Sequence, residues 1–190
     1  MRVIAGSHRG RRLSGPDGAA LRPTSDKVRQ ALFSILGARV SGARFLDLYA
    51  GTGAVGIEAL SRGAAAVTFV ESDPTAVQLL QKNLRACQLF DRARIHQGKT
   101  AAFLDQKGCW DGPYDVLFAD PPYAALDELD IIAHAWRPGL LSAHATVIIE
   151  QNSRAEWSAS INHASLVQRY VYGDTTLYLY GLSTPESTAL

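Results

Sequence analysis

The run L-F-A-D-P-P-Y, residues 117–123, places an acid, two prolines and a tyrosine directly after an apolar stretch. The carboxylate of Asp120 can accept hydrogen bonds, and Pro121 and Pro122 restrict the backbone around it. Tyr123 adds an aromatic ring that can stack on a planar group. The pattern suits a rigid acceptor site for the hydrogens of an amine. The alternative is an ordinary proline-rich turn.

A glycine-rich segment upstream is the second place where chemistry is indicated. Residues 50–56 read A-G-T-G-A-V-G and fit the pattern G-x-G-x-x-G, and Glu71 follows Gly51 by twenty positions. Glycines allow a ligand to approach the backbone closely, and the acid can accept hydrogen bonds from ribose hydroxyls. NAD and S-adenosylmethionine both carry an adenosine, so the pattern fits either cofactor. A tight turn without a ligand is the remaining alternative.

Asp47 favours S-adenosylmethionine over NAD. It lies within the predicted strand 45–48, which is otherwise apolar and precedes the loop. Dinucleotide-binding proteins usually have apolar residues at this position. An acid there can meet the cationic amino group of a methionine moiety, either directly or through the loop. The chain also leaves little sequence for the second domain that a nicotinamide-dependent enzyme normally needs.

The elements that must hold these motifs alternate between strand and helix patterns. Predicted strands lie at 45–48, 66–70, 94–96, 115–119 and 146–150, and predicted helices follow at 54–62, 74–87, 100–107 and 126–136. A further helix begins near 24–26. Such alternation predicts an α/β fold with a parallel sheet covered by helices on both faces. Two β-rich runs, 166–172 and 175–180, flank Gly173-Asp174 and predict a closing antiparallel hairpin.

Charge is distributed unevenly along the chain. Residues 1–44 contain nine Lys or Arg and two acidic residues, a net charge of +7, whereas the remainder has ten basic and sixteen acidic residues, a net charge of −6. A basic segment on an acidic body suits a polyanionic partner, although a solvated surface segment has the same composition. Lys27 and Arg29 fall in the first turn of a predicted helix, where the helix dipole disfavours cations. A nearby anion would offset this effect.

Several classes of protein are disfavoured by composition. A length of 190 residues suits one domain with a small extension. Cys87 and Cys109 provide no disulfide framework, and the five scattered histidines lack metal-ligand spacing, so we expect no metal. There is no signal-peptide pattern and no apolar run of membrane-spanning length, so we expect a cytoplasmic protein. No sequence feature indicates an oligomeric state.

Taken together, the motifs resemble class I S-adenosylmethionine-dependent methyltransferases. The resemblance rests on F-L-D-L-Y-A-G-T-G-A-V-G-I-E-A-L-S-R-G-A, on Glu71, on D-P-P-Y and on the terminal hairpin. It implies a Rossmann-like, mostly parallel seven-stranded sheet that ends in an antiparallel hairpin. The D-P-P-Y motif is typical of members that methylate exocyclic amines.

The N-terminal sequence narrows the resemblance further. R-V-I-A-G-S-H-R-G-R-R-L and L-R-P-T-S-D-K-V-R-Q-A-L-F-S-I-L are similar to the RsmD family, which methylates the N2 amine of a guanine in small-subunit (16S) ribosomal RNA. The implied partner is that RNA or an assembling 30S particle. We expect a basic N-terminal arm or hairpin at 1–24, a methyltransferase domain at 25–182 and a tail at 183–190.

This resemblance assigns expected roles to individual residues. The catalytic set is Asp120, Pro121, Pro122 and Tyr123. The cofactor-binding set is Asp47, Tyr49, Gly51, Gly53, Glu71, Ser72, Lys99, Thr100 and Asp120. The RNA-binding set is Arg9, Arg11, Arg12, Arg22, Thr24 and Arg29. One departure concerns Lys99, because many members have Asp or Asn after the third strand, where it contacts the adenine. Lysine cannot accept a hydrogen bond from the adenine amine.

The expected reaction needs positioning and neither a metal nor a covalent nucleophile. The lone pair of an exocyclic amine is delocalised into the ring, so the site must turn the nitrogen toward the methyl group. Asp120 and the carbonyl of Pro121 can accept the amine hydrogens, while Tyr123 stacks on a base taken out of its helix or loop. The alternatives are an amine methyltransferase of DNA adenine or protein glutamine, a nicotinamide-dependent enzyme and a non-catalytic RNA-binding module.

Overall fold

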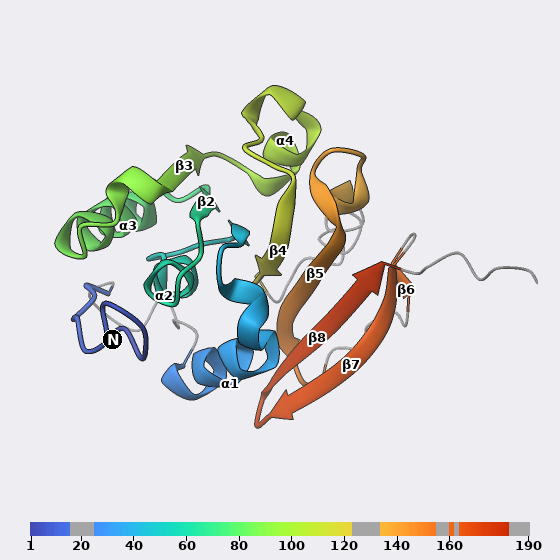
Figure 1. Cartoon of the computed structure of the whole chain (residues 1–190), viewed down its shortest axis with the longest axis horizontal. Coiled ribbons are helices and arrows are strands. Elements are labelled where there is room, and N and C mark those ends of the chain that lie inside the picture. The colour runs from blue at the N-terminus through green and yellow to red at the C-terminus, as the bar shows by residue number, and fades with distance from the viewer. Residues whose placement is uncertain (16–24, 123–133, 155–159, 162–163, 183–190) are drawn as a thin grey trace, which may run out of the picture.

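The computed structural model describes residues 1–15, 25–122, 134–154, 160–161 and 164–182. Its strands are β1 Arg44–Leu48, β2 Ala66–Glu71, β3 Ala93–Gln97, β4 Tyr114–Ala119, β5 Leu141–Asn152, β6 Ser160–Ile161, β7 Ala164–Tyr172 and β8 Thr175–Leu182. They form one sheet in the order β3-β2-β1-β4-β5-β8-β7-β6. Figure 1 shows this sheet extending across the molecule. From β1, the chain first adds β2 and β3 on one side and then adds β4 and β5 on the other, so the strand order reverses at β1.

Strand directions confirm the predicted fold class. Strands β1 to β5 pair in parallel, and β8 is antiparallel to both β5 and β7. The hairpin turn is the predicted Gly173-Asp174, and Gly173 has φ 64°. The two-residue β6, which pairs with the start of β7, is an eighth strand that sequence patterns did not indicate.

The helices begin and end close to their predicted boundaries. They are α1 Asp26–Leu36, α2 Ala54–Ser61, α3 Pro74–Ala86 and α4 Thr100–Asp105, with 3-10 turns η1 Gly37–Val40, η2 Phe90–Arg92, η3 Lys107–Cys109 and η4 His134–Trp136. Ser25 caps α1 by accepting a hydrogen bond from the N–H of Val28 at 3.2 Å. Asp73 caps α3 in the same way, through the N–H of Thr75 at 2.8 Å. The predicted helix at 126–136 lies largely outside the described residues.

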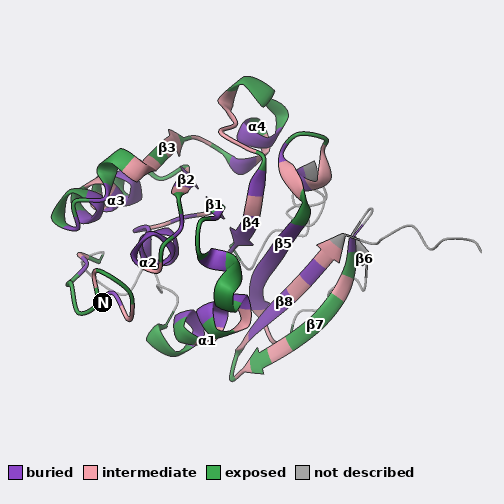
Figure 2. Ribbon diagram, in the orientation of Figure 1, coloured by how far each residue is buried: buried purple, intermediate pink, exposed green. Residues whose placement is uncertain are grey.

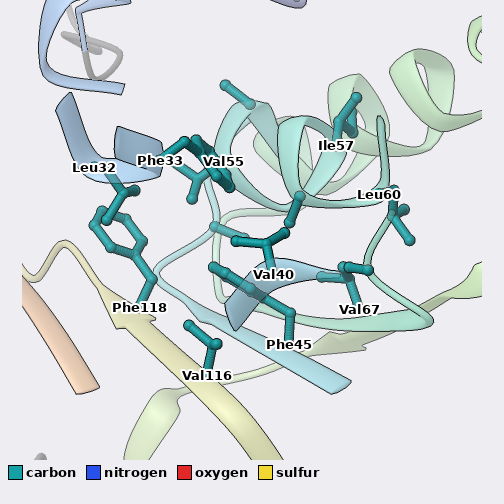
Figure 3. Packing of buried hydrophobic residues seen from close by; sticks show 14 of the residues in the cluster. Leu32, Phe33, Val40, Phe45, Val55, Ile57, Leu60, Val67, Val116 and Phe118 are labelled. Atoms are coloured by element: carbon teal, nitrogen blue, oxygen red, sulfur yellow. The ribbon is translucent and has the colours of Figure 1, made fainter. Parts of the chain in front are cut away.

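Helices cover both faces of the sheet because side chains alternate along each strand. Phe45 and Phe118 belong to the core cluster that includes residues of α1, α2 and α3, and Figure 3 shows this packing. Leu46 and Leu117 point the other way, into a cluster with α4 residues such as Phe103. Each such buried side chain contributes about 1.5–3 kcal/mol. The central strands are accordingly buried and the outer helix surfaces exposed (Figure 2).

Residues 1–13 fold back on themselves at the edge of this core. Arg2 and Arg12 form an antiparallel bridge, and the N–H of Val3 donates to the carbonyl of Arg11 at 2.9 Å. Val3 and Leu13 are buried in the same cluster as α1. The predicted short hairpin is therefore present and fixed to the body of the protein. Across the described part of the chain, no helix has the length and apolar character needed to cross a membrane.

Candidate functional site

Three acidic side chains lie at the carboxyl ends of neighbouring strands. Asp47 is on β1, Glu71 ends β2 and Asp120 follows β4, and β1 lies between the other two strands. Alternation along β1 turns Asp47 toward the same face as Phe45, where α2 packs. The charges of Asp120 and Glu71 both raise the pKa of Asp47, as expected for carboxyl groups that lie near one another. In open α/β sheets this edge is where ligands bind.

Asp47 itself is buried, with 1% of its surface exposed. Its Oδ2 atom accepts a hydrogen bond from the N–H of Gly56 in the first turn of α2, at 2.9 Å. Burial is the main reason that the pKa of Asp47 rises to about 8, and the bond from Gly56 opposes the rise. Burial also raises the pKa of Asp120 to about 7. The sequence allows Asp47 to act on a cofactor either directly or through the loop. Because its carboxyl group is buried and bonds to the backbone shortly after the loop, this geometry favours the indirect route.

The glycine loop, residues 50–53, connects β1 to α2 and has two glycines with different tasks. Gly51 and Gly53 have φ 53° and 79°, values that side-chain-bearing residues rarely adopt. A Cβ at Gly53 would lie 2.1 Å from Cδ1 of Leu80, so Gly53 lets the loop pack against α3. A Cβ at Gly51 would meet nothing within 4 Å. The surface available to a ligand is therefore on the Gly51 side.

Glu71 holds this loop in place. Its Oε2 atom accepts a hydrogen bond from the N–H of Gly51 at 2.7 Å, and Oε1 accepts from the N–H groups of Ser72 at 2.7 Å and Asp73 at 2.8 Å. An ionised carboxylate has about four acceptor positions, so these three bonds leave capacity for a hydroxyl group. Ser72, predicted to bind the cofactor, is exposed and in this structure donates its N–H to Glu71.

Tyr49 has an unusual conformation directly before the loop. Its φ is 60°, which is rare for a residue other than glycine, and such strained residues cluster at functional sites. Its hydroxyl group is buried and has no hydrogen-bond partner among the described residues. A buried donor without a partner is costly, and a bound ligand can supply the partner.

The D-P-P-Y motif lies beside this group, at the end of β4. The N–H of Asp120 faces the carbonyl of Leu48 at 3.5 Å, which aligns the motif with the end of β1. Pro121 is buried and Pro122 is exposed, so the turn emerges from the core at this point. Tyr123 lies outside the described residues.

The turn after β3 carries the remaining predicted cofactor residues. The N–H of Gly98 donates to the carbonyl of Glu71 at 2.9 Å, which fixes the turn beside the end of β2. Lys99 is exposed at the N-cap of α4 and makes no capping side-chain bond, whereas Thr100 is buried. The structure therefore links the turn at Gly98 to Glu71 through the backbone and leaves the Lys99 side chain at the surface.

These residues fit S-adenosylmethionine in their chemistry. Glu71 retains acceptor capacity for ribose, the Gly51 side of the loop is open, and the hydroxyl group of Tyr49 has no partner within the described part of the chain. The charges of Asp120 and Glu71 both act on the nearby Asp47, and an acidic environment of this kind suits a ligand with cationic groups. Among the described residues, no cluster of His, Cys, Asp or Glu is arranged to hold a metal ion.

The predicted RNA-binding residues of the hairpin differ in their environments. Arg9, Arg11 and Arg12 are all exposed, and of these three only Arg11 bonds through its side chain to the body of the protein among the described residues. Arg11 donates through one guanidinium nitrogen to the carbonyl of Ala86 at 3.3 Å, near the C-terminus of α3. A cavity of about 260 Å³ lies against this surface and is lined in part by Arg2 and Arg9. Arg22 and Thr24, also predicted to bind RNA, lie outside the described residues.

The position of Arg29 contradicts the prediction that it contacts RNA directly. Its side chain is fully buried, and one terminal nitrogen donates to the carbonyl of Arg2 at 2.6 Å and to Oδ1 of Asp26 at 2.9 Å. Its Nε lies 3.9 Å from Oε2 of Glu58. The anion predicted near the first turn of α1 is therefore supplied by the protein, and Arg29 joins α1 to the hairpin and α2.

Glu58 is a buried acid that sequence patterns missed. Its carboxylate accepts hydrogen bonds from the N–H groups of Ile4 at 2.7 Å and Ala5 at 2.9 Å, and it pairs with Nε of Arg62 at 2.7 Å. A single acid in an apolar helix gives no local signal of its partners, so only its tertiary contacts reveal its role. Glu58 fixes the N-terminal hairpin to α2.

Comparison with known proteins gives a consistent result. The family model described as "Conserved hypothetical protein 95" matches residues 1–181. The Bacillus subtilis (strain 168) protein named "Putative rRNA methyltransferase YlbH" is 31% identical over 180 residues, which cover 95% of this chain and 98% of that protein. "Ribosomal RNA small subunit methyltransferase D" of Escherichia coli (strain K12) is 44% identical over 123 residues, which cover 65% of this chain and 60% of that protein.

Solved structures agree with this relationship. The Escherichia coli protein described as "Putative methyltransferase yhhF" is 36% identical and superposes with a TM-score of 0.83, covering 96% of this chain and 98% of that chain. A Pyrococcus horikoshii protein that is 17% identical has a TM-score of 0.73 over 90% of this chain and 94% of that chain, and this likeness shows a shared fold.

Proposed function

The chain belongs to the family described as "Conserved hypothetical protein 95", and we propose that it methylates the exocyclic N2 amine of a guanine in small-subunit ribosomal RNA. The observation that carries this proposal is the position of D-P-P beside Asp47 and Glu71, at the carboxyl edge of the sheet. An amine-acceptor motif and a nucleoside-binding acid then face the same space. The relatives named for ribosomal RNA methylation support the choice of substrate.

S-adenosylmethionine supplies an activated methyl group through its sulfonium. Glu71 would hold the ribose hydroxyls, while the Gly51 side of the loop accommodates the ligand next to the backbone. In our assignment this position is surrounded by Tyr49, Ser72, Lys99 and Thr100. The hydroxyl of Tyr49 is a donor without a partner among the residues that the structure describes. Gly53 and Asp47 support the loop from behind, through α3 and α2.

The target amine is oriented by the D-P-P-Y motif. The carboxylate of Asp120 accepts one amine hydrogen, and the carbonyl of Pro121 accepts the other, so the nitrogen lone pair turns toward the methyl group. Pro121 and Pro122 keep both acceptors fixed, and Tyr123 stacks on the extruded base. Much of the rate acceleration then comes from holding the reactants in line.

We assign RNA contact to the arm, residues 1–24. Arg9 and Arg12 present exposed guanidinium groups there, and Arg22 and Thr24 belong to the same segment of sequence. Such groups neutralise phosphates and fix the orientation of the RNA without reading its sequence. An assembling 30S particle is the proposed form of the substrate, and the reaction is assigned to the cytoplasm on that ground. The domain at 25–182 carries the chemistry, and 183–190 is a tail.

The test is methyl transfer to defined substrates. Purified protein is incubated with labelled S-adenosylmethionine and either small-subunit RNA or 30S particles from cells that lack the gene, and the methylated nucleoside is then identified. We expect N2-methylguanosine at one position, at a higher yield on particles. Methylated adenine in DNA or methylated glutamine in protein would replace this proposal with another amine methyltransferase. RNA binding without transfer would indicate a non-catalytic module.

A further inference from the structure

The side chain of Asn83 on α3 connects the N-terminal hairpin to the glycine loop. Its Oδ1 atom accepts a hydrogen bond from the N–H of Ser14 at 2.7 Å. Its Nδ2 atom donates to the carbonyl of Ser14 at 3.0 Å and to the carbonyl of Thr52 at 3.0 Å. One amide group therefore bonds to two chain segments that are 38 residues apart in sequence, through three hydrogen bonds.

Asn83 is buried and bonds only to backbone atoms in these three contacts, which limits how the arrangement can change. Asn83 has 1% of its surface exposed, so water cannot readily replace a lost partner. Both amide hydrogens are used, and the partners are backbone atoms, whose positions change only when the segment moves. Thr52 lies between Gly51 and Gly53 and is itself buried. The amide thus fixes the position of the glycine loop relative to the end of the hairpin.

A second attachment makes the hairpin and the loop one mechanical unit. Glu58 binds the N–H groups of residues 4 and 5, and Ser61 donates its hydroxyl to the carbonyl of Ala5 at 2.6 Å. Gly6 permits this close approach, because a Cβ there would lie 1.9 Å from the carbonyl oxygen of Ser61. Glu58 and Ser61 are both on α2, which begins at Ala54 directly after the loop. A displacement of the hairpin is therefore transmitted both to Thr52 in the glycine loop and to α2 directly after the loop.

We propose that Asn83 is a positioning residue that couples RNA binding on the arm to cofactor binding at the glycine loop. This inference rests on the proposed function, since it requires both ligands. RNA that holds the arm fixes Ser14, and the Asn83 amide then fixes the carbonyl of Thr52 in the conformation that the cofactor needs. The coupling is reciprocal, because each ligand must raise the affinity for the other by the same factor.

The experiment measures that factor directly. Dissociation constants for S-adenosylmethionine are determined with and without a saturating small-subunit RNA fragment, and those for the RNA with and without saturating S-adenosylmethionine. For the unaltered protein we expect each ligand to tighten the other by roughly fivefold or more, the lower end of typical allosteric coupling. The factor by which RNA tightens S-adenosylmethionine binding must equal the factor by which S-adenosylmethionine tightens RNA binding.

The variants separate coupling from simple structural support. Asn83→Asp keeps an acceptor for the N–H of Ser14 but loses both donors, so the bond to Thr52 disappears. We expect its coupling factor to fall to about one, and S-adenosylmethionine binding without RNA to weaken as well, because the glycine loop loses this support. Gln78→Ala, which removes an exposed amide from the same helix, should leave the factor unchanged. Ser14→Pro removes the N–H donor from the other side and should weaken coupling even where Asn83 variants fold poorly.

The outcomes are distinct. Coupling that survives in both Asn83→Asp and Ser14→Pro would overturn the inference, as would a factor of one in the unaltered protein that binds both ligands. A variant that lowers the melting temperature and both separate affinities equally, with its coupling intact, would make Asn83 a purely structural residue. Failure of the unaltered protein to bind RNA would overturn the proposed function and this inference together.

Discussion

The carboxylate of Glu71 accepts a hydrogen bond from the backbone N–H of Gly51 at 2.7 Å, so the acid assigned to the ribose also holds the loop that the ligand must approach. Both oxygens of Glu71 are occupied by N–H groups from two sides, and the carboxylate is oriented before any ligand arrives. Preorganisation of this kind lowers the ordering cost of binding. It also means that a substitution of Glu71 acts on the ligand contact and on the loop at once.

Replacement of Glu71 by Ala should weaken S-adenosylmethionine binding by roughly 1.5–3 kcal/mol for each charge-assisted hydrogen bond lost to the ribose. Glu71→Gln retains one acceptor oxygen and should be less damaging. Titration calorimetry measures both effects, with NAD as the comparison ligand. Tight binding of NAD and no binding of S-adenosylmethionine would contradict the cofactor assignment.

Cofactor affinity should rise as the pH increases from about 6 to 8. The pKa values of Asp47 and Asp120 are raised to about 8 and about 7, so near neutrality Asp47 is largely protonated and Asp120 is partly protonated in the ligand-free protein. A cationic ligand favours their charged forms, and binding should therefore release protons. Calorimetry in buffers of different ionisation enthalpy detects this release. Asp47→Asn should reduce it, and an equal release in that variant would contradict the assignment to Asp47.

The raised pKa of Asp47 also predicts how the stability of the ligand-free protein depends on pH. The folded pKa of Asp47 lies above its unfolded value of 3.8, so the folded state retains a proton that the unfolded state loses. The stabilising contribution is complete below about pH 4, decreases as pH rises, and is lost above about 8. Chemical denaturation across this range should show Asp47→Asn to be less sensitive to pH than the unaltered protein.

Local patterns predicted helices α1 to α4, every strand except β6 and the acids at the strand ends, because these features depend on residues that are close together in the sequence. The strand before Asp120 and the loop at Gly51 follow from apolar runs and glycines. Arg29 was assigned wrongly, since a charge count does not reveal that Glu58 on α2 lies against it. Asn83 was missed for the same reason, because a single amide in a helix gives no local signal.

The exposed arginines of the arm should supply phosphate contacts. Replacing Arg9 and Arg12 by Ala should weaken RNA binding and reduce the log–log salt slope by roughly one unit for each lost contact. Arg11→Ala added to this pair should have a smaller further effect on RNA, because Arg11 bonds to the carbonyl of Ala86. Fluorescence anisotropy at several salt concentrations measures the slope, and an unchanged affinity and slope would refute the role of the arm.

Arg29 should behave in the opposite way. Arg29→Ala removes the cation that pairs with Asp26 and lies 3.9 Å from Glu58. Because Glu58 keeps Arg62, the cost should stay below the roughly 3–5 kcal/mol of a fully broken buried pair. Arg29→Met fills the same space without a charge and should be less destabilising. Denaturant unfolding measures both. The salt slope of RNA binding should stay unchanged in Arg29→Met, and a decrease by one unit would restore Arg29 as a phosphate contact.

Asp120 should matter for the rate of methyl transfer far more than for cofactor affinity. Its carboxylate is assigned to the target amine, so its loss removes an interaction that is used when the amine reacts. Asp120→Ala should abolish most transfer while the fold and S-adenosylmethionine binding persist. Asp120→Asn should be milder, because the amide oxygen still accepts one hydrogen bond. Single-turnover transfer of a labelled methyl group to small-subunit RNA measures the step directly.

Tyr123 provides the companion measurement at the same motif. Tyr123→Ala should weaken the hold on the extruded base by roughly 1–3 kcal/mol, the usual contribution of one base–aromatic stack. Tyr123→Phe keeps the ring and should be tolerated, since stacking does not need the hydroxyl group. These variants separate base capture, read from RNA affinity, from amine orientation, read from the rate with Asp120→Ala. If Asp120→Ala retained a near-normal single-turnover rate, D-P-P-Y would be only a turn, and the proposed amine methylation would fail with it.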